Sequence, residues 1–90
     1  MEPYLTLEDE LRLVEHAKTN MQAFNELYEY YFQKIYIFCV NRLGNKEISE
    51  DITSQTFLLA VEYIAKFDTS KQIRFGSWLY KVASNKIIDH

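Results

Sequence analysis

The scarcity of turn-forming residues is the feature that most constrains this sequence. Only two glycines and one proline occur in 90 residues. A sheet protein of this length needs several tight turns, and turns use Gly, Pro, Asn and Asp for specific backbone reasons. The length fits one domain, because domains typically have about 50–250 residues. We therefore expect an all-α fold, a compact bundle of about four helices.

The spacing of apolar residues predicts helices over residues 7–18 and 21–43, from just after Asn45 to 65, and from 75 to the chain end. Thr6 and Asn20 are placed to cap the first two, and Gly44 to end the second. A polar loop is expected at 66–74. The expected core positions are Leu7, Leu11, Val14 and Ala17, then Phe24, Leu27, Tyr28, Tyr31, Ile35, Phe38 and Cys39, then Ile48, Ile52, Leu59 and Tyr63, and finally Leu79, Val82, Ala83 and Ile87.

Composition indicates a soluble, folded protein. Hydrophobic residues make up 48% and charged residues 26%, which is typical of globular domains. The single cysteine, Cys39, excludes an internal disulfide and favours a reducing compartment. No apolar run approaches the roughly 20 residues that a membrane span needs, and the acidic first ten residues lack a signal-peptide pattern. We expect a cytoplasmic protein without membrane contact.

Charge is divided unevenly along the chain. Residues 1–65 hold five Lys/Arg and eleven Asp/Glu, whereas residues 66–90 hold five Lys/Arg and two Asp/Glu. This asymmetry suggests two surfaces with different partners. The overall net charge of −3 argues against indiscriminate duplex binding, because phosphate contacts dominate that affinity. In the last helix, positions that share one side at about 100° per residue are mostly polar, which fits either a solvated face or a binding face.

Three blocks of the sequence resemble conserved region 2 of bacterial sigma factors, and most closely the extracytoplasmic-function (ECF) group of the sigma-70 family. They read "AFNELYEYYFQKIYIFCVNRLGN", "SEDITSQTFLLAVEYIAKFD" and "FGSWLYKVASNKIIDH". The resemblance implies that residues 21–90 form the region 2 domain, with residues 1–20 as an N-terminal helix that belongs to it or leads into it. It implies a helical domain that performs no chemistry, binds the clamp helices of the RNA polymerase β′ subunit, and reads and melts the −10 promoter element.

In this family the third helix contacts polymerase, through a block that usually reads Glu-Asp-Leu-Val-Gln-Glu-Thr-Phe-Leu. The resemblance therefore implies a polymerase-binding set of Glu50, Asp51, Ser54, Gln55 and Leu58. Ser54 and Gln55 depart from the usual residues. Judged from the residues alone, the acids could equally serve the helix N-terminus.

The loop and the fourth helix correspond to the parts of the family that touch the non-template strand of the −10 element. The resemblance implies a DNA-binding set of Phe67, Asp68, Ser70, Lys71, Arg74, Lys81, Asn85 and Lys86. Lysine can neutralise a phosphate, and asparagine offers a donor and an acceptor to a base edge. Many relatives have glycine where this chain has Gln72. Trp78 and Phe75 are expected to pack in or near the core, and Tyr30 to face outward.

Other functions have little support in the sequence. The two histidines, His16 and His90, lack spaced Cys or carboxylate partners, so we expect no metal, no cofactor and no enzyme activity. The remaining alternative is a helical protein-interaction module that does not contact DNA. An anti-sigma protein is a possible further partner. We expect the chain to stop before the region 4 domain of a longer protein.

Overall fold

A computed structural model describes residues 5–90 of the chain, and these residues form helices and short connections without any strand. The four main helices are α1 (Leu7–Ala17), α2 (Met21–Leu43), α3 (Lys46–Tyr63) and α4 (Phe75–Asp89). Two short 3₁₀ helices, η1 (Ile64–Lys66) and η2 (Thr69–Lys71), lie in the connection between α3 and α4. The predicted all-α bundle of four helices is confirmed.

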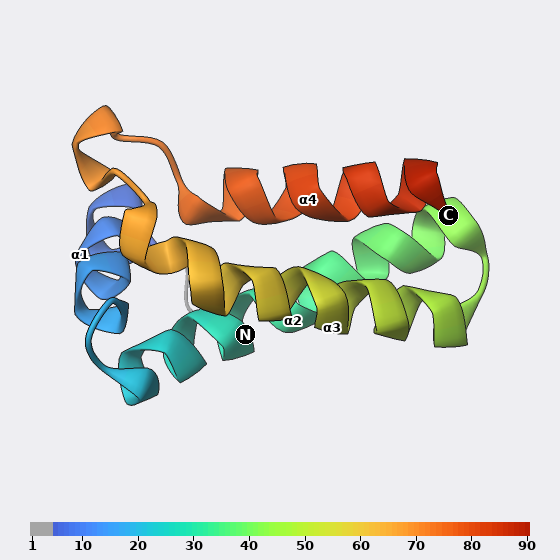
Figure 1. Cartoon of the computed structure of the whole chain (residues 1–90), viewed down its shortest axis with the longest axis horizontal. Coiled ribbons are helices and arrows are strands. Elements are labelled where there is room, and N and C mark those ends of the chain that lie inside the picture. The colour runs from blue at the N-terminus through green and yellow to red at the C-terminus, as the bar shows by residue number, and fades with distance from the viewer. Residues whose placement is uncertain (1–4) are drawn as a thin grey trace.

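The long helices lie alongside one another, and α1 crosses one end of the bundle (Figure 1). Helices α2 and α4 run in the same direction, while α3 runs in the opposite direction. The connection through η2 lies above α1 at that same end, and the last residues of α4 lie near the turn between α2 and α3.

The predicted helix ends are close to the observed ones. Thr6 and Asn20 cap α1 and α2, with the Thr6 hydroxyl accepting a hydrogen bond from the Asp9 N–H at 3.1 Å. Gly44 ends α2 in the left-handed conformation (φ 63°), which glycine adopts at low cost. The third helix ends at Tyr63, two residues before its predicted end, because the chain tightens into η1.

The inner face of α3 differs from the prediction. Leu59 was expected in the core but is 40% exposed, whereas Ser49, Thr53 and Thr56 are fully buried. Their hydroxyls donate to the backbone carbonyls four residues earlier at 2.6–2.8 Å, so no buried donor is lost. These small residues let α3 pack closely, and the apolar periodicity did not reveal this face. Cys39 is buried against Thr53 as expected, and burial raises the pKa of its thiol.

One buried acid joins three helices, and nothing in the sequence pattern marked it. The Glu10 side chain of α1 is fully buried. Its carboxylate accepts hydrogen bonds from the Tyr31 hydroxyl of α2 at 2.5 Å and from Arg74 at 2.8 Å. The Gly76 N–H in the first turn of α4 donates to its second oxygen at 3.2 Å. Burial, together with the Glu10 carboxylate, raises the pKa of Tyr31.

Replacing Glu10 by alanine should lower the free energy of unfolding by about 3–5 kcal/mol, because one partner of a buried ion pair would be lost. Chemical denaturation measures the change. The matched control is Glu8→Ala, since Glu8 lies in the same helix but is exposed and pairs with Arg12 at the surface. The control should shift stability by about 0.5 kcal/mol or less. Equal effects for the two variants would contradict a structural role for the Glu10 cluster.

Candidate functional site

The outward ridge of α4 carries the two strongest DNA-binding candidates. Phe75, Leu79 and Ala83 form the buried face of the helix. Ser77, Lys81 and Asn85 recur at the same four-residue spacing on the other side, and all three are exposed. Lys81 and Asn85 therefore present a cation and an amide to solvent, as the binding hypothesis requires.

Two predicted phosphate contacts also bond to other parts of the bundle. Lys86 is half-buried and lies two turns beyond Leu79 on α4. Its ammonium donates to the Gln55 side chain of α3 at 3.3 Å. Arg74 donates to the Glu10 carboxylate and, at 2.8 Å, to the Leu5 carbonyl. Both cations link elements of the bundle, and their contact with DNA stays a prediction.

Phe67 was predicted to line an open pocket, and that prediction is wrong. The side chain is only 8% exposed. Its ring packs edge-on against Phe75, with 5.1 Å between ring centroids, and lies near Tyr63. The core thus extends into the first residue of the connection, because a large apolar ring is more stable when it is removed from water.

The other predicted loop residues are exposed and shape the turn. The Asp68 carboxylate accepts hydrogen bonds from the Ser70 hydroxyl at 2.6 Å and from its N–H at 2.9 Å. These bonds lower the pKa of Asp68. Gln72 follows η2 with a positive φ of 56°, a conformation that favours glycine. This explains physically why glycine suits the position in similar proteins. Lys71 is exposed at the end of η2.

Helix α1 holds the loop in place from a distant part of the sequence. The Lys18 ammonium donates to the Phe67 carbonyl at 2.8 Å and to Glu15 at 2.9 Å. The Thr69 hydroxyl donates to the same Glu15 carboxylate at 2.7 Å. The hydrogen bonds from Lys18 and Thr69 lower the pKa of Glu15. The conformation of the loop therefore depends on residues about 50 positions earlier.

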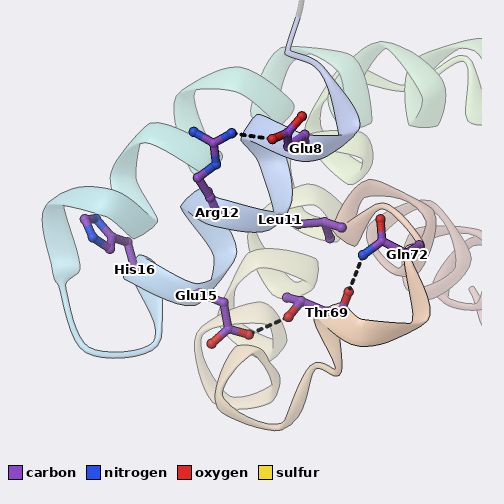
Figure 2. Close-up of a pocket in the computed structure, with 7 residues that line it drawn as sticks. All are labelled: Glu8, Leu11, Arg12, Glu15, His16, Thr69 and Gln72. Carbon is purple, nitrogen blue, oxygen red and sulfur yellow. Dashed lines mark hydrogen bonds and ion pairs between the residues drawn. The ribbon is translucent and has the colours of Figure 1, made fainter.

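A pocket of about 390 Å³ lies between α1 and the loop (Figure 2). Its walls are formed by Glu8, Leu11, Arg12, Glu15 and His16 on one side and by Thr69 and Gln72 on the other. The predicted liners Phe67, Asp68, Ser70 and Lys71 are not among them. Two carboxylates disfavour a phosphate here, so the pocket suits an uncharged base edge better than the DNA backbone. The sequence did not predict that α1 forms one wall of this pocket, because no local sequence signal relates α1 to the loop.

The predicted polymerase-binding residues all lie on the exposed side of α3. Glu50, Asp51, Ser54, Gln55 and Leu58 are each exposed. Acids outnumber bases by four to one between residues 46 and 63.

An apolar groove continues this surface toward α2 and was not predicted. It has a volume of about 390 Å³ and is lined by Met21, Phe24, Asn25, Tyr28, Ser54, Phe57, Leu58 and Val61. Met21 is 63% exposed and Leu58 is 68% exposed. Tyr28, expected in the core, lies at the rim with its ring 5.0 Å from that of Phe57. Exposed apolar surface of this kind is a candidate site for a protein partner.

Among residues 5–90, no three His, Cys, Asp or Glu side chains gather where a metal ion could bind. In the same part of the chain, no helix combines the length and the apolar character needed to cross a membrane.

The fold and these surfaces define a small helical domain built for binding, with an acidic face on α3 and a polar, partly basic ridge on α4. Comparison with known families identifies it: residues 27–90 match the family model for sigma-70 region 2, and the chain belongs to this family. Family membership supports the expectation that the domain is not an enzyme.

Curated relatives agree with this assignment. The chain is 40% identical over 81 residues to the ECF RNA polymerase sigma factor BldN of Streptomyces coelicolor. The matched segment covers 89% of the chain and 30% of that protein. It is 36% identical over 78 residues to the ECF RNA polymerase sigma factor SigW of Bacillus subtilis, covering 87% of the chain and 41% of that protein. The chain thus spans less than half the length of these relatives. No solved structure gave a significant match.

Replacing Ser70 by alanine should raise the pKa of Asp68 toward its ordinary value, because the hydroxyl that stabilises the carboxylate would be lost. The lowered pKa means that Asp68 favours the turn above its ordinary pKa, and that this contribution is lost as the pH falls through the lowered value. NMR titration of the carboxyl carbon measures the shift. Ser77→Ala, an exposed serine on α4, is the control and should leave the pKa of Asp68 unchanged. An unchanged pKa in the Ser70 variant would contradict the role of this hydrogen bond.

Proposed function

We propose that this chain is the part of an ECF sigma factor that binds RNA polymerase and opens promoter DNA. In this proposal α3 binds the clamp helices of β′, while α4 and the loop before it hold non-template bases of the −10 element. The observation that carries it is the exposed ridge of Lys81 and Asn85 on a helix whose other face is fixed in the core. The names of the relatives support the class of function.

The α3 surface supports a protein partner through two complementary features. Glu50 and Asp51 would attract a basic helical partner and steer its association. The groove beside Leu58 would receive a large side chain of the partner, and a few such buried anchors carry most of the affinity of an interface. A cytoplasmic location follows from this partner and belongs to the same proposal, as does any control by an anti-sigma protein.

The α4 ridge and the loop support contact with an unstacked strand. Flipping a base costs a few kcal/mol, which local contacts must offset. Lys81 would neutralise a phosphate and Asn85 would bond to a base edge. The pocket between α1 and the loop has room for a base. Trp78 is an unsuitable stacking platform, because it already stacks on Tyr63 with 4.5 Å between ring centroids.

The apolar groove also fits the alternative function, a protein-interaction module without DNA contact. The two functions differ in the salt dependence of oligonucleotide binding. Contact with single-stranded DNA lowers the logarithm of the binding constant by about 0.7 for each neutralised phosphate per tenfold rise in salt. Absence of binding to a −10 non-template oligonucleotide, with β′ binding retained, would favour the alternative.

Lys81→Ala and Asn85→Ala should each weaken promoter-dependent transcription in a reconstituted assay without loss of fold, since both side chains are exposed. Asn85→Ala should lower the affinity for the −10 oligonucleotide by about 5- to 160-fold, equivalent to roughly 1–3 kcal/mol for a base contact. Lys81→Ala should reduce the slope of the logarithm of the binding constant against the logarithm of the salt concentration by about 0.7. Lys46→Ala, at the exposed start of α3, is the control for oligonucleotide binding and should leave its affinity and salt dependence unchanged. Normal initiation by either α4 variant would remove that residue from the DNA-binding site.

Asp51→Arg should reduce affinity for a β′ clamp-helix fragment by about tenfold or more, because it reverses the charge facing a basic partner. A pull-down or calorimetry with the fragment measures this. Glu26→Arg makes the same charge change at an exposed position of α2 outside the groove and should bind normally. Unchanged affinity of the Asp51 variant would exclude this part of α3 from the interface.

A further inference from the structure

One acid of α1 lies beside the loop where the proposed function calls for positive charge. Glu15 is exposed and lines the pocket between α1 and the loop. A carboxylate next to a bound strand repels its phosphates, so by charge alone Glu15 would weaken DNA binding. The contacts that Glu15 makes indicate a different role.

The Glu15 carboxylate is the centre of a connection between α1 and the loop. One of its oxygens accepts hydrogen bonds from the Thr69 hydroxyl at 2.7 Å and from the Lys18 ammonium at 2.9 Å. The same ammonium donates to the Phe67 carbonyl at 2.8 Å. Figure 2 shows the Glu15 side chain directed toward Thr69. We call these four groups the Glu15 clamp: the Glu15 carboxylate, the Lys18 ammonium, the Phe67 carbonyl and the Thr69 hydroxyl.

The turn that follows Thr69 is closed by bonds within the loop. The Ser70 N–H and hydroxyl both donate to the Asp68 carboxylate. The Gln72 N–H and its side-chain amide both donate to the Thr69 carbonyl, at 3.2 and 3.3 Å. Gln72 also has a positive φ of 56°, which is unfavourable for a residue with a side chain. The turn therefore depends on Asp68 and Thr69, and the Glu15 clamp attaches this part of the loop to α1.

We propose that Glu15 is a positioning residue for DNA binding, which acts through the loop and not by touching the strand. The inference rests on the proposed function and adds a residue of α1 to those that determine DNA affinity. A loop that is already ordered loses less conformational entropy when a nucleotide binds, so the clamp raises affinity by preorganisation. The ion pair with Lys18 also offsets the charge of the carboxylate and limits its repulsion of phosphate.

The first test is the sign of the effect of removing this acid. Glu15→Ala should lower the affinity of the chain for a fluorescent −10 non-template oligonucleotide by about 2- to 10-fold, the effect of one hydrogen bond. Loss of negative charge alone predicts the opposite, a rise in affinity. Asp9→Ala is the matched control, because it removes the same charge from an exposed position of α1 that pairs with Arg12 and not with the loop. The control should leave the affinity unchanged or raise it slightly.

Two further variants separate positioning from direct contact with DNA. Glu15→Gln keeps an oxygen that can accept from Thr69, so it should restore the affinity that Glu15→Ala loses. Thr69→Val removes the hydroxyl, and adding Glu15→Ala to it should lower the affinity little further, because both changes remove the same bond. If Glu15→Ala had its full effect in the Thr69→Val background, Glu15 would contact DNA directly and the positioning role would be wrong. A glutamine variant as weak as the alanine variant would also contradict it.

Hydrogen exchange in the free chain reports on the loop without DNA. The amides of residues 70–72 should exchange faster in Glu15→Ala, while those of α2 keep their rates, because the loss of order is local. Unchanged loop amides, or an affinity that is unchanged or higher in Glu15→Ala, would overturn the positioning role and leave the proposed function standing. Absence of oligonucleotide binding by the unaltered chain would overturn both.

Discussion

The placement of the loop and of α4 depends on the hydrogen bonds that the buried Glu10 carboxylate accepts. It connects α1 to Tyr31 in the middle of α2 and to Arg74 and Gly76 at the start of α4. A side-chain carbon at position 76 would collide with the Tyr31 ring, so the absence of a side chain there lets the two helices approach. Together with the bonds from Lys18 and Thr69, this cluster fixes both ends of the loop that precedes α4.

Charge is separated in the folded chain more fully than along the sequence. The acids of α3 face solvent on one side of the bundle, whereas residues 30–43 of α2 and residues 74–88 contain no Asp or Glu. A domain with net charge −3 can therefore carry a local basic surface. Such a surface gives weak binding to nucleic acid by itself, because the surrounding acids oppose phosphate. A partner that holds the domain next to DNA would raise its effective concentration there, so that weak local contacts would be sufficient for DNA binding.

The sequence predicted the helices well because their signals are local. Caps at Thr6, Asn20 and Gly44 lie within a few residues of the ends that they define. The exposed positions of Lys81 and Asn85 followed from helical periodicity. Phe67 was misplaced, and the bonds of Arg74 and Lys86 within the bundle were not predicted, because their partners come from other elements: Phe75, Glu10 and Gln55. The α1 wall of the pocket could not be predicted for the same reason, and Leu59 was misplaced because hydroxyl residues form the inner face of α3.

Simultaneous binding of both partners tests most directly whether the two surfaces are separate. The chain would be saturated with a β′ clamp-helix fragment and then titrated with a fluorescent −10 non-template oligonucleotide. Separate surfaces predict a ternary complex, with oligonucleotide affinity equal to or greater than that of the free chain. Release of the fragment as the oligonucleotide binds would show that both use one surface, and would contradict the assignment of α3 to polymerase and α4 to DNA.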